Sequence, residues 1–132
     1  MPKKDVLIVD DEAGIRELFR AAVQDHGYLA DVAGTVADAL KHLEEHRYRL
    51  VIVDWRLPDG DGTVVANLAA ETGAHTLVMS GYLAHLPAGS VDLRQTIMKP
   101  IRPAQLITIV GECIGKPSVA PQQTQSDGAN RG

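Results

Sequence analysis

Three aspartates in this sequence stand directly after two strongly apolar runs. Asp10 and Asp11 follow Val6–Val9, and Asp54 follows Leu50–Val53. Carboxylates that meet at one place repel one another unless a cation offsets their charge. Oxygen ligands that leave positions for water suit Mg²⁺, which binds through one or two carboxylates and a phosphate. These residues are therefore candidates for a magnesium-assisted phosphate site.

A hydroxyl group and an ammonium group follow two further β-like runs. Ser80 comes after Thr76–Met79, and Lys99 comes after Thr96–Met98. Opposite a metal ion, these two side chains could hold two phosphoryl oxygens. A carboxylate nucleophile, a metal and two oxygen anchors fit phosphoryl transfer to an aspartate, with Asp54 as the acceptor.

Each of these residues also has a simpler interpretation. Asp11 stands where an aspartate often caps a helix, and Ser80 before Gly81 can be a turn residue. Asp54 can merely lead into the turn at 57–60. Taken together at four strand ends, the simpler interpretations require a coincidence, so we prefer the functional one.

The runs that precede these residues alternate with helix patterns. With Leu29–Ala33 as the second, there are five β-like runs, and the first and third are apolar on both faces. Such strands suit a parallel sheet that helices cover on both sides. The order predicts a doubly wound α/β sheet. Because ligands bind beyond the carboxyl ends of the strands in such sheets, the fold would bring the polar residues together.

The helices have recognisable starts, ends and apolar faces. Asp11 is the predicted N-cap of the first helix, and Gly27 is its stop. Thr35 caps the second, the third spans about residues 62–72, and the last begins near Pro103. The expected apolar faces of the first, second and last helices are Ile15, Leu18, Phe19, Ala22 and Val23; Val36, Ala39, Leu40 and Leu43; and Leu106, Ile107, Val110 and Ile114.

Two stretches interrupt this regular pattern. Residues 81–92 contain Pro87 and Gly89 at the place of a fourth helix, which is therefore expected to be shortened or irregular. Residues 116–132 have almost nothing to bury, which predicts a disordered C-terminal tail. The folded domain is expected to span residues 1–115.

Composition narrows the class of protein. The 132 residues, of which 45% are apolar, allow one domain with a sizeable core. A net charge of −4 without a basic run argues against direct binding to nucleic acid or an anionic membrane. Cys113, the one cysteine, cannot form an internal disulfide. No signal peptide or membrane span is evident, so we expect a cytoplasmic protein.

Four motifs occur in order along the chain. They are Val-Leu-Ile-Val-Asp-Asp-Glu at 6–12, Val-Ile-Val-Asp-Trp-Arg-Leu-Pro-Asp-Gly-Asp-Gly at 51–62, Met-Ser-Gly at 79–81 and Met-Lys-Pro at 98–100. Over about residues 4–115 this combination resembles the receiver domain of two-component response regulators. The resemblance implies a flavodoxin-like, five-stranded parallel sheet with strand order 2-1-3-4-5.

The same resemblance assigns roles to the candidate residues. A histidine kinase or a histidine phosphotransfer protein would donate a phosphoryl group to Asp54. Asp11, Asp54 and the backbone carbonyl of Arg56 would bind Mg²⁺ directly, and Asp10 would act mainly through water. The protein would not be an enzyme but a phosphoacceptor that assists its own phosphotransfer and autodephosphorylation. Its output would be protein contacts or onward phosphotransfer.

The resemblance also implies that Ser80 and Lys99 contact the phosphoryl oxygens, and that Lys99-Pro100 is a cis peptide. The sequence departs from the family nearby. Thr96 stands where most receivers have a switch tyrosine or phenylalanine, and Ile101 replaces the aromatic residue that usually follows Lys-Pro. Tyr82 could take over the reporting role, or it could simply anchor its loop.

Three other features of the sequence involve residue types that can bind a metal or affect the site. His42 and His46 have a spacing that can hold a metal, but nothing evidently completes the ligand set. Cys113 is interpreted as a small core residue. Trp55 and Arg56 directly follow the acceptor, and we expect them to line the mouth of the site and to influence the lifetime of the acyl phosphate.

A stand-alone receiver, as a monomer or weak dimer, is the preferred interpretation. Since little follows residue 115, a DNA-binding transcription factor is not expected. One alternative is a hydrolase with an aspartyl-phosphate intermediate, but residues 55–57 are Trp-Arg-Leu and supply no second general acid. The other is a phosphorylation-independent protein-interaction module with a vestigial site, against which the complete set of five polar residues argues.

Overall fold

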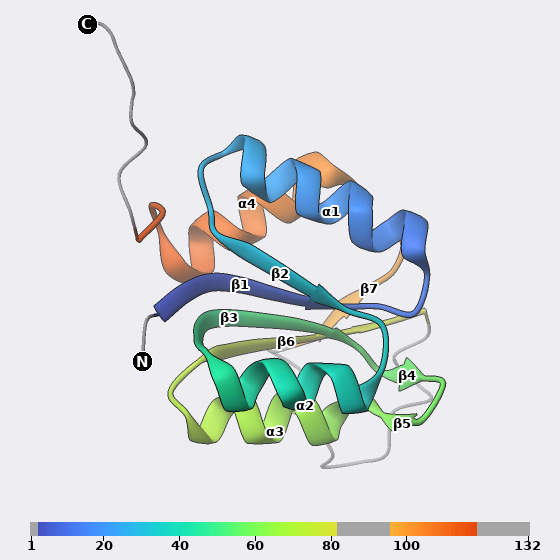
Figure 1. Ribbon diagram of the computed structural model, residues 1–132. Helices are drawn as coiled ribbons and strands as arrows, with labels where there is room; N and C mark the ends of the chain where they lie inside the picture. The colour runs from blue at the N-terminus through green and yellow to red at the C-terminus, as the bar shows by residue number, and fades with distance from the viewer. Residues whose placement is uncertain (1–2, 82–95, 119–132) are drawn as a thin grey trace, which may run out of the picture.

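Five parallel strands form the centre of the structure, a computed structural model that describes residues 3–81 and 96–118. The strands lie in the order β2-β1-β3-β6-β7 (Figure 1). Counted along the chain, this is the predicted order of the five strands, which confirms the expected fold. The strands are β1 (Lys3–Val9), β2 (Ala30–Ala33), β3 (Arg47–Asp54), β6 (His75–Ser80) and β7 (Thr96–Met98).

Four described helices cover the two faces of the sheet. Helices α1 and α4 pack on one face, and α2 and α3 pack on the other (Figure 1). None of the helices within the described residues is long and apolar enough to cross a membrane. The helices are α1 (Ala13–Asp25), α2 (Val36–Glu45), α3 (Gly62–Glu71) and α4 (Pro103–Ile114).

Strand β1 contributes to both cores at once. Val6 and Ile8 pack into the core beneath α1 and α4, whereas Leu7 and Val9 pack into the core beneath α2 and α3. All four side chains are fully buried. Because successive side chains of a strand point to opposite faces, a stretch of strand that packs into cores on both sides favours apolar residues at successive positions. This is the physical reason for the uninterrupted apolar run.

Several predicted helix boundaries are confirmed. The Thr35 hydroxyl accepts a hydrogen bond from the backbone N–H of Asp38 at 3.0 Å, as an N-cap does. Gly27 and Gly73, which follow α1 and α3, have left-handed backbone angles with φ of 90° and 94°. Pro103 occupies the first turn of α4.

Two details of the first helix were predicted wrongly. Asp11 is not the N-cap: Glu12 holds that position, and its N–H donates to the Asp10 carboxylate at 2.9 Å. The buried Asp10 therefore takes the local backbone donor, and Asp11 remains exposed. Leu18 was expected on the buried face but is 48% exposed, and of the predicted stripe only Phe19 and Val23 are buried.

A short hairpin follows β3 and contacts the second helix. Strands β4 (Arg56–Leu57) and β5 (Gly60–Asp61) pair antiparallel. Between them, the Asp59 carboxylate accepts hydrogen bonds from the N–H groups of Val36 and Ala37 at 2.7 and 3.0 Å. These backbone donors hold the pKa of Asp59 below its ordinary value. Asp59 thus satisfies free donors at the start of α2, a role that the sequence did not indicate.

A buried ion pair lies toward the amino-terminal ends of β1 and β3. The Asp5 side chain is completely buried, and Arg49 donates to it at 2.9 Å. The N–H groups of Leu29 and Ser118 also donate to this carboxylate, at 2.9 and 3.1 Å. Burial raises the pKa of Asp5, but these hydrogen bonds lower it by a larger amount, so that the pKa lies below its ordinary value.

Arg49 connects this ion pair to the end of the last helix. Its guanidinium donates to the backbone carbonyls of Ile114 and Lys116, the latter at 2.8 Å. Tyr28 adds a hydrogen bond from its hydroxyl to the carbonyl of Gly115 at 2.6 Å. These hydrogen bonds satisfy carbonyls at and directly after the end of α4, and they connect this end of the helix to the sheet.

Two predicted segments fall largely outside the described residues. Of the tail predicted at 116–132, the structure describes 116–118, which lie beside the Asp5–Arg49 pair. Of the segment at 81–92, it describes Gly81 alone, and Tyr82 also lies outside the described residues.

We predict that Asp5→Asn lowers the free energy of unfolding by about 3 kcal/mol at pH 7, since it leaves the Arg49 charge without its buried partner. Urea denaturation measures this change. Glu17→Gln is the matched control, because it breaks an exposed ion pair with Arg20 and should have little effect. Equal midpoints for Asp5→Asn and the wild type would contradict the assignment.

The wild type and Asp5→Asn should also differ in how their stability depends on pH. The native pKa of Asp5 lies below the unfolded value of about 3.9. The ionised carboxylate therefore stabilises the fold above that pH, and this stabilisation is lost as the pH falls through the native pKa. The difference in stability between the wild type and Asp5→Asn should close below about pH 4.

Candidate functional site

The carboxyl ends of β1 and β3 bring three carboxylates together. Asp10, Asp11 and Asp54 each offer one oxygen, and these oxygens lie within 4.8 Å of one another. Asp10 is completely buried, Asp54 is 8% exposed, and Asp11 is exposed. Among the residues that the structure describes, no other group of three or more metal-binding side chains is found. The spatial cluster expected from the sequence is therefore present.

Lys99 reaches this cluster from the end of β7. Its ammonium group donates to Oδ2 of Asp10 at 3.2 Å and to Oδ2 of Asp54 at 3.0 Å. The two contacts place one positive charge between two buried negative charges. This partly offsets a repulsion that would otherwise oppose the close approach of the strand ends.

The electrostatics of Asp54 and Lys99 follow from burial and from each other. Burial raises the pKa of Asp54, and the hydrogen bond from Lys99 offsets only part of that effect, so the pKa lies above its ordinary value. Burial lowers the pKa of Lys99, but its contacts with Asp54 and Asp10 outweigh the loss of water and raise it. The two carboxylates therefore stabilise the charged form of Lys99.

Backbone hydrogen bonds align the strand ends that carry the site. The N–H of Trp55 donates to the carbonyl of Met79 at 2.8 Å, and the N–H of Lys99 donates to the carbonyl of Ser80 at 2.8 Å. Ser80 is buried at the last position of β6. The Lys99-Pro100 peptide is cis, as the family resemblance implied.

The residues after Asp54 form the start of the short hairpin. The guanidinium of the exposed Arg56 lies 5.1 Å from the centre of the Trp55 ring. Trp55 and Arg56 line a surface hollow of about 290 Å³ with Leu57, Gly60 and Asp61. Their influence on the lifetime of an acyl phosphate stays a prediction.

The two positions where the sequence departs from the family lie on either side of Lys99. Thr96 is partly buried in β7, and Ile101 is buried. Beside Ile101, a hollow of about 350 Å³ opens between the start of α1 and the connection from β7 to α4. Its lining includes Phe19, Lys99 and Ile101, so it adjoins the acidic cluster.

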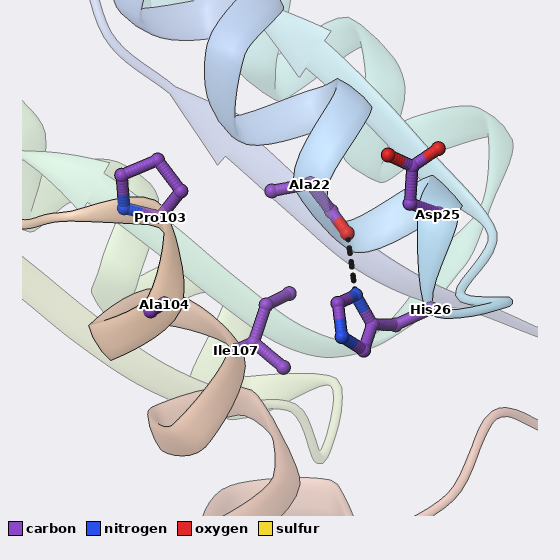
Figure 2. Close-up of a pocket in the computed structure, with 6 residues that line it drawn as sticks. All are labelled: Ala22, Asp25, His26, Pro103, Ala104 and Ile107. Atoms are coloured by element: carbon purple, nitrogen blue, oxygen red, sulfur yellow. Dashed lines mark hydrogen bonds between the residues drawn. The ribbon is translucent and has the colours of Figure 1, made fainter.

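A third hollow lies away from the cluster. It has a volume of about 410 Å³, and α1 and α4 form its walls (Figure 2). His26 lines it and forms a hydrogen bond through Nδ1 with the carbonyl of Ala22 at 3.0 Å. None of the predicted site residues lines this hollow.

His42, His46 and Cys113 belong to the framework of the fold. His42 Nδ1 lies 3.9 Å from the carboxylate of Asp31, which also accepts a hydrogen bond from the Tyr48 hydroxyl. His46 packs edge-on against the Tyr48 ring. Neither histidine belongs to the metal-binding group described above. Cys113 packs against the core beneath α1 and α4, in agreement with its interpretation as a core residue.

Gly62 has a steric role that the motif alone did not explain. A Cβ atom at this position would lie 2.0 Å from the backbone oxygen of Asp54. The N–H of Gly62 donates to the carbonyl of Trp55 at 2.7 Å, which holds the two segments at this close approach. Only glycine allows the start of α3 to pass so near to Asp54.

We predict that Gly62→Ala lowers the free energy of unfolding by about 3 kcal/mol or more, because backbone atoms must move to admit the methyl group. Urea denaturation provides the measurement. Gly111→Ala is the control, since nothing lies within 4 Å of a Cβ atom there and α4 should become more stable by about 0.5–1 kcal/mol. Similar midpoints for the two variants would contradict the close approach at Gly62.

Comparison with known proteins establishes the family. The family model described as the response regulator receiver domain matches residues 6–111, and the chain belongs to this family. It is therefore a receiver domain of the two-component response-regulator type.

Individual relatives agree with this assignment. The chain is 28% identical over 128 residues to an uncharacterized 14.6 kDa protein of Leptolyngbya boryana, covering 89% of this chain and 95% of that protein. It is 29% identical over 115 residues to the DNA-binding response regulator MtrA of Mycolicibacterium paratuberculosis, covering 82% of this chain. The chain spans only about half the length of MtrA.

A solved structure shows the same fold with a ligand. The response regulator protein TrrA from Thermotoga maritima, in complex with Mg²⁺-BeF, superposes with a TM-score of 0.70 and 29% sequence identity. The match covers 84% of this chain and 99% of that chain.

Proposed function

We propose that this receiver domain is an Mg²⁺-dependent phosphoacceptor and that Asp54 takes a phosphoryl group from a histidine kinase or a histidine phosphotransfer protein. The observation that carries the proposal is the position of the Lys99 ammonium between the carboxylates of Asp10 and Asp54. An ammonium group held beside a carboxylate nucleophile can neutralise charge on an incoming phosphoryl group.

The donor set fits a hard divalent cation. It consists of carboxylate oxygens, the ligand type that Mg²⁺ prefers, and the exposed Asp11 leaves one side of the cluster open to solvent. In the proposed site Asp11 and Asp54 would hold the ion with the backbone carbonyl of Arg56, and Asp10 would act through water. When bound, the ion would neutralise phosphoryl oxygens during transfer. The TrrA complex with Mg²⁺-BeF supports such an occupancy in a related receiver.

The transfer itself needs only one nucleophile. A carboxylate oxygen of Asp54 attacks the phosphorus of the donor phosphohistidine; the new O–P bond forms as the N–P bond breaks, and the electron pair of that bond stays on the imidazole. Lys99 would pass from the free carboxylate to a phosphoryl oxygen, and the Ser80 hydroxyl would donate to another. The chain thus acts as a phosphoacceptor that assists its own phosphorylation and dephosphorylation, with output through protein contacts or onward phosphotransfer.

We predict that Asp54→Asn abolishes phosphorylation, because an amide lacks the nucleophilic oxyanion. The measurement is transfer of labelled phosphate from a panel of purified, autophosphorylated histidine kinases. Asp38→Asn is the matched control, since it changes an exposed aspartate on α2 and should leave transfer intact. Label on the Asp54→Asn protein would overturn the assignment of the acceptor.

Magnesium binding can be followed without a kinase. Trp55, the one tryptophan of the chain, adjoins Asp54. We predict that Mg²⁺ changes its fluorescence saturably, that a chelator reverses the change, and that Asp11→Asn or Asp54→Asn weakens binding by roughly tenfold or more. Asp38→Asn should bind Mg²⁺ like the wild type. A wild-type protein without a saturable response would refute the proposed metal site.

A further inference from the structure

Arg16 contacts the loop that carries two of the three clustered carboxylates. It lies in the first turns of α1, and its Nη1 donates to the backbone carbonyl of Asp10 at 2.8 Å. Arg16 is partly buried and Asp10 is completely buried. A charged donor on a buried carbonyl forms one of the stronger hydrogen bonds in a protein. The contact therefore fixes the backbone immediately before Asp11.

Gly34 leaves the space that this arginine occupies. A Cβ atom at Gly34 would lie 2.8 Å from Nη1 of Arg16 and 3.3 Å from its Cζ. The backbone angle φ of Gly34 is not in the left-handed region, so its conformation does not require glycine. The space for the guanidinium is the feature that distinguishes glycine from alanine at this position.

Four hydrogen bonds to other residues hold Asp10 in place. Its N–H donates to the carbonyl of Ala33 at 3.0 Å. One carboxylate oxygen accepts from the N–H of Glu12, and the other accepts from Lys99. The hydrogen bond from Arg16 to the carbonyl completes this set. The exposed Asp11 then projects from a backbone whose position is fixed one residue earlier.

We propose that Arg16 is a positioning residue for the proposed metal site: it holds the backbone of Asp10 and Asp11 so that their carboxylates meet that of Asp54. The inference rests on the proposed function, because it concerns the same site. Electrostatic interaction between Arg16 and the metal ion, taken alone, predicts the opposite effect of Arg16 on Mg²⁺ affinity. A guanidinium near the cluster repels a divalent cation, so that its removal would strengthen Mg²⁺ binding if charge were the dominant effect.

The sign of the change in Mg²⁺ affinity therefore tests the proposal. With Trp55 fluorescence as the readout, Arg16→Ala should weaken Mg²⁺ binding roughly tenfold, as the loss of an outer-shell partner typically does. Arg16→Lys retains a donor and should recover part of the affinity. Arg20→Ala is the matched control, because it removes the same charge one turn further along α1, where the side chain pairs with Glu17 at the surface.

Gly34→Ala tests the same contact from the other side. The added methyl group displaces the end of a flexible side chain, so the fold should persist while the hydrogen bond to Asp10 is lost. Gly34→Ala should weaken Mg²⁺ binding in the wild-type background and have no further effect in the Arg16→Ala background. Urea denaturation of each variant verifies that the proteins remain folded.

The outcomes separate two failures. Unchanged or tighter Mg²⁺ binding by Arg16→Ala, or additive effects of the two substitutions, would overturn the role of Arg16 while the metal site itself stands. A wild-type protein that does not respond to Mg²⁺ would overturn the proposed metal site, and the role of Arg16 with it. Weaker binding in both single variants, without additivity, supports the proposal.

Discussion

The charge balance between Lys99, Asp10 and Asp54 constrains the whole functional edge of the sheet. Two buried carboxylates come from the ends of adjacent strands, where their mutual repulsion opposes close packing. A single ammonium group, 3.2 and 3.0 Å from them, offsets that repulsion. It can do so only if β7 lies beside β6, which the hydrogen bond between the backbones of Lys99 and Ser80 ensures. The charge balance of the site therefore depends on the order of the strands.

The two edges of the sheet use similar residues for different purposes. At the amino-terminal edge, Asp5 receives hydrogen bonds from Arg49 and two backbone N–H groups, and the result is a closed structural connection to the end of α4. At the carboxyl-terminal edge, Asp11 stays exposed beside two buried carboxylates that share one lysine. Unbalanced negative charge that remains open to solvent is suited to binding a cation and a phosphoryl group, whereas a saturated ion pair is not.

Much of the fold could be predicted because its determinants are local. The apolar runs of β1 and β3 are continuous since both faces of these strands are covered, and the polar residues directly after them had to lie at one sheet edge. Helix ends at Gly27, Gly73 and Pro103 follow from backbone preferences of single residues. The prediction failed at the start of α1, where either of two neighbouring aspartates could accept a hydrogen bond from the backbone. The N–H of Glu12 donates to Asp10 and not to Asp11.

The strands and most of the buried helix positions could be predicted from the sequence alone, as could the three carboxylates and the lysine that meet at one sheet edge, since periodicity and neighbouring residues encode them. The contacts between residues far apart in the sequence are apparent only in the folded structure. Asp59 caps a helix 23 residues earlier, Arg49 binds Asp5 across 44 residues, and Ser118 reaches Asp5 across 113. Such contacts have no local pattern, because they arise when packed elements bring distant donors and acceptors within about 3 Å.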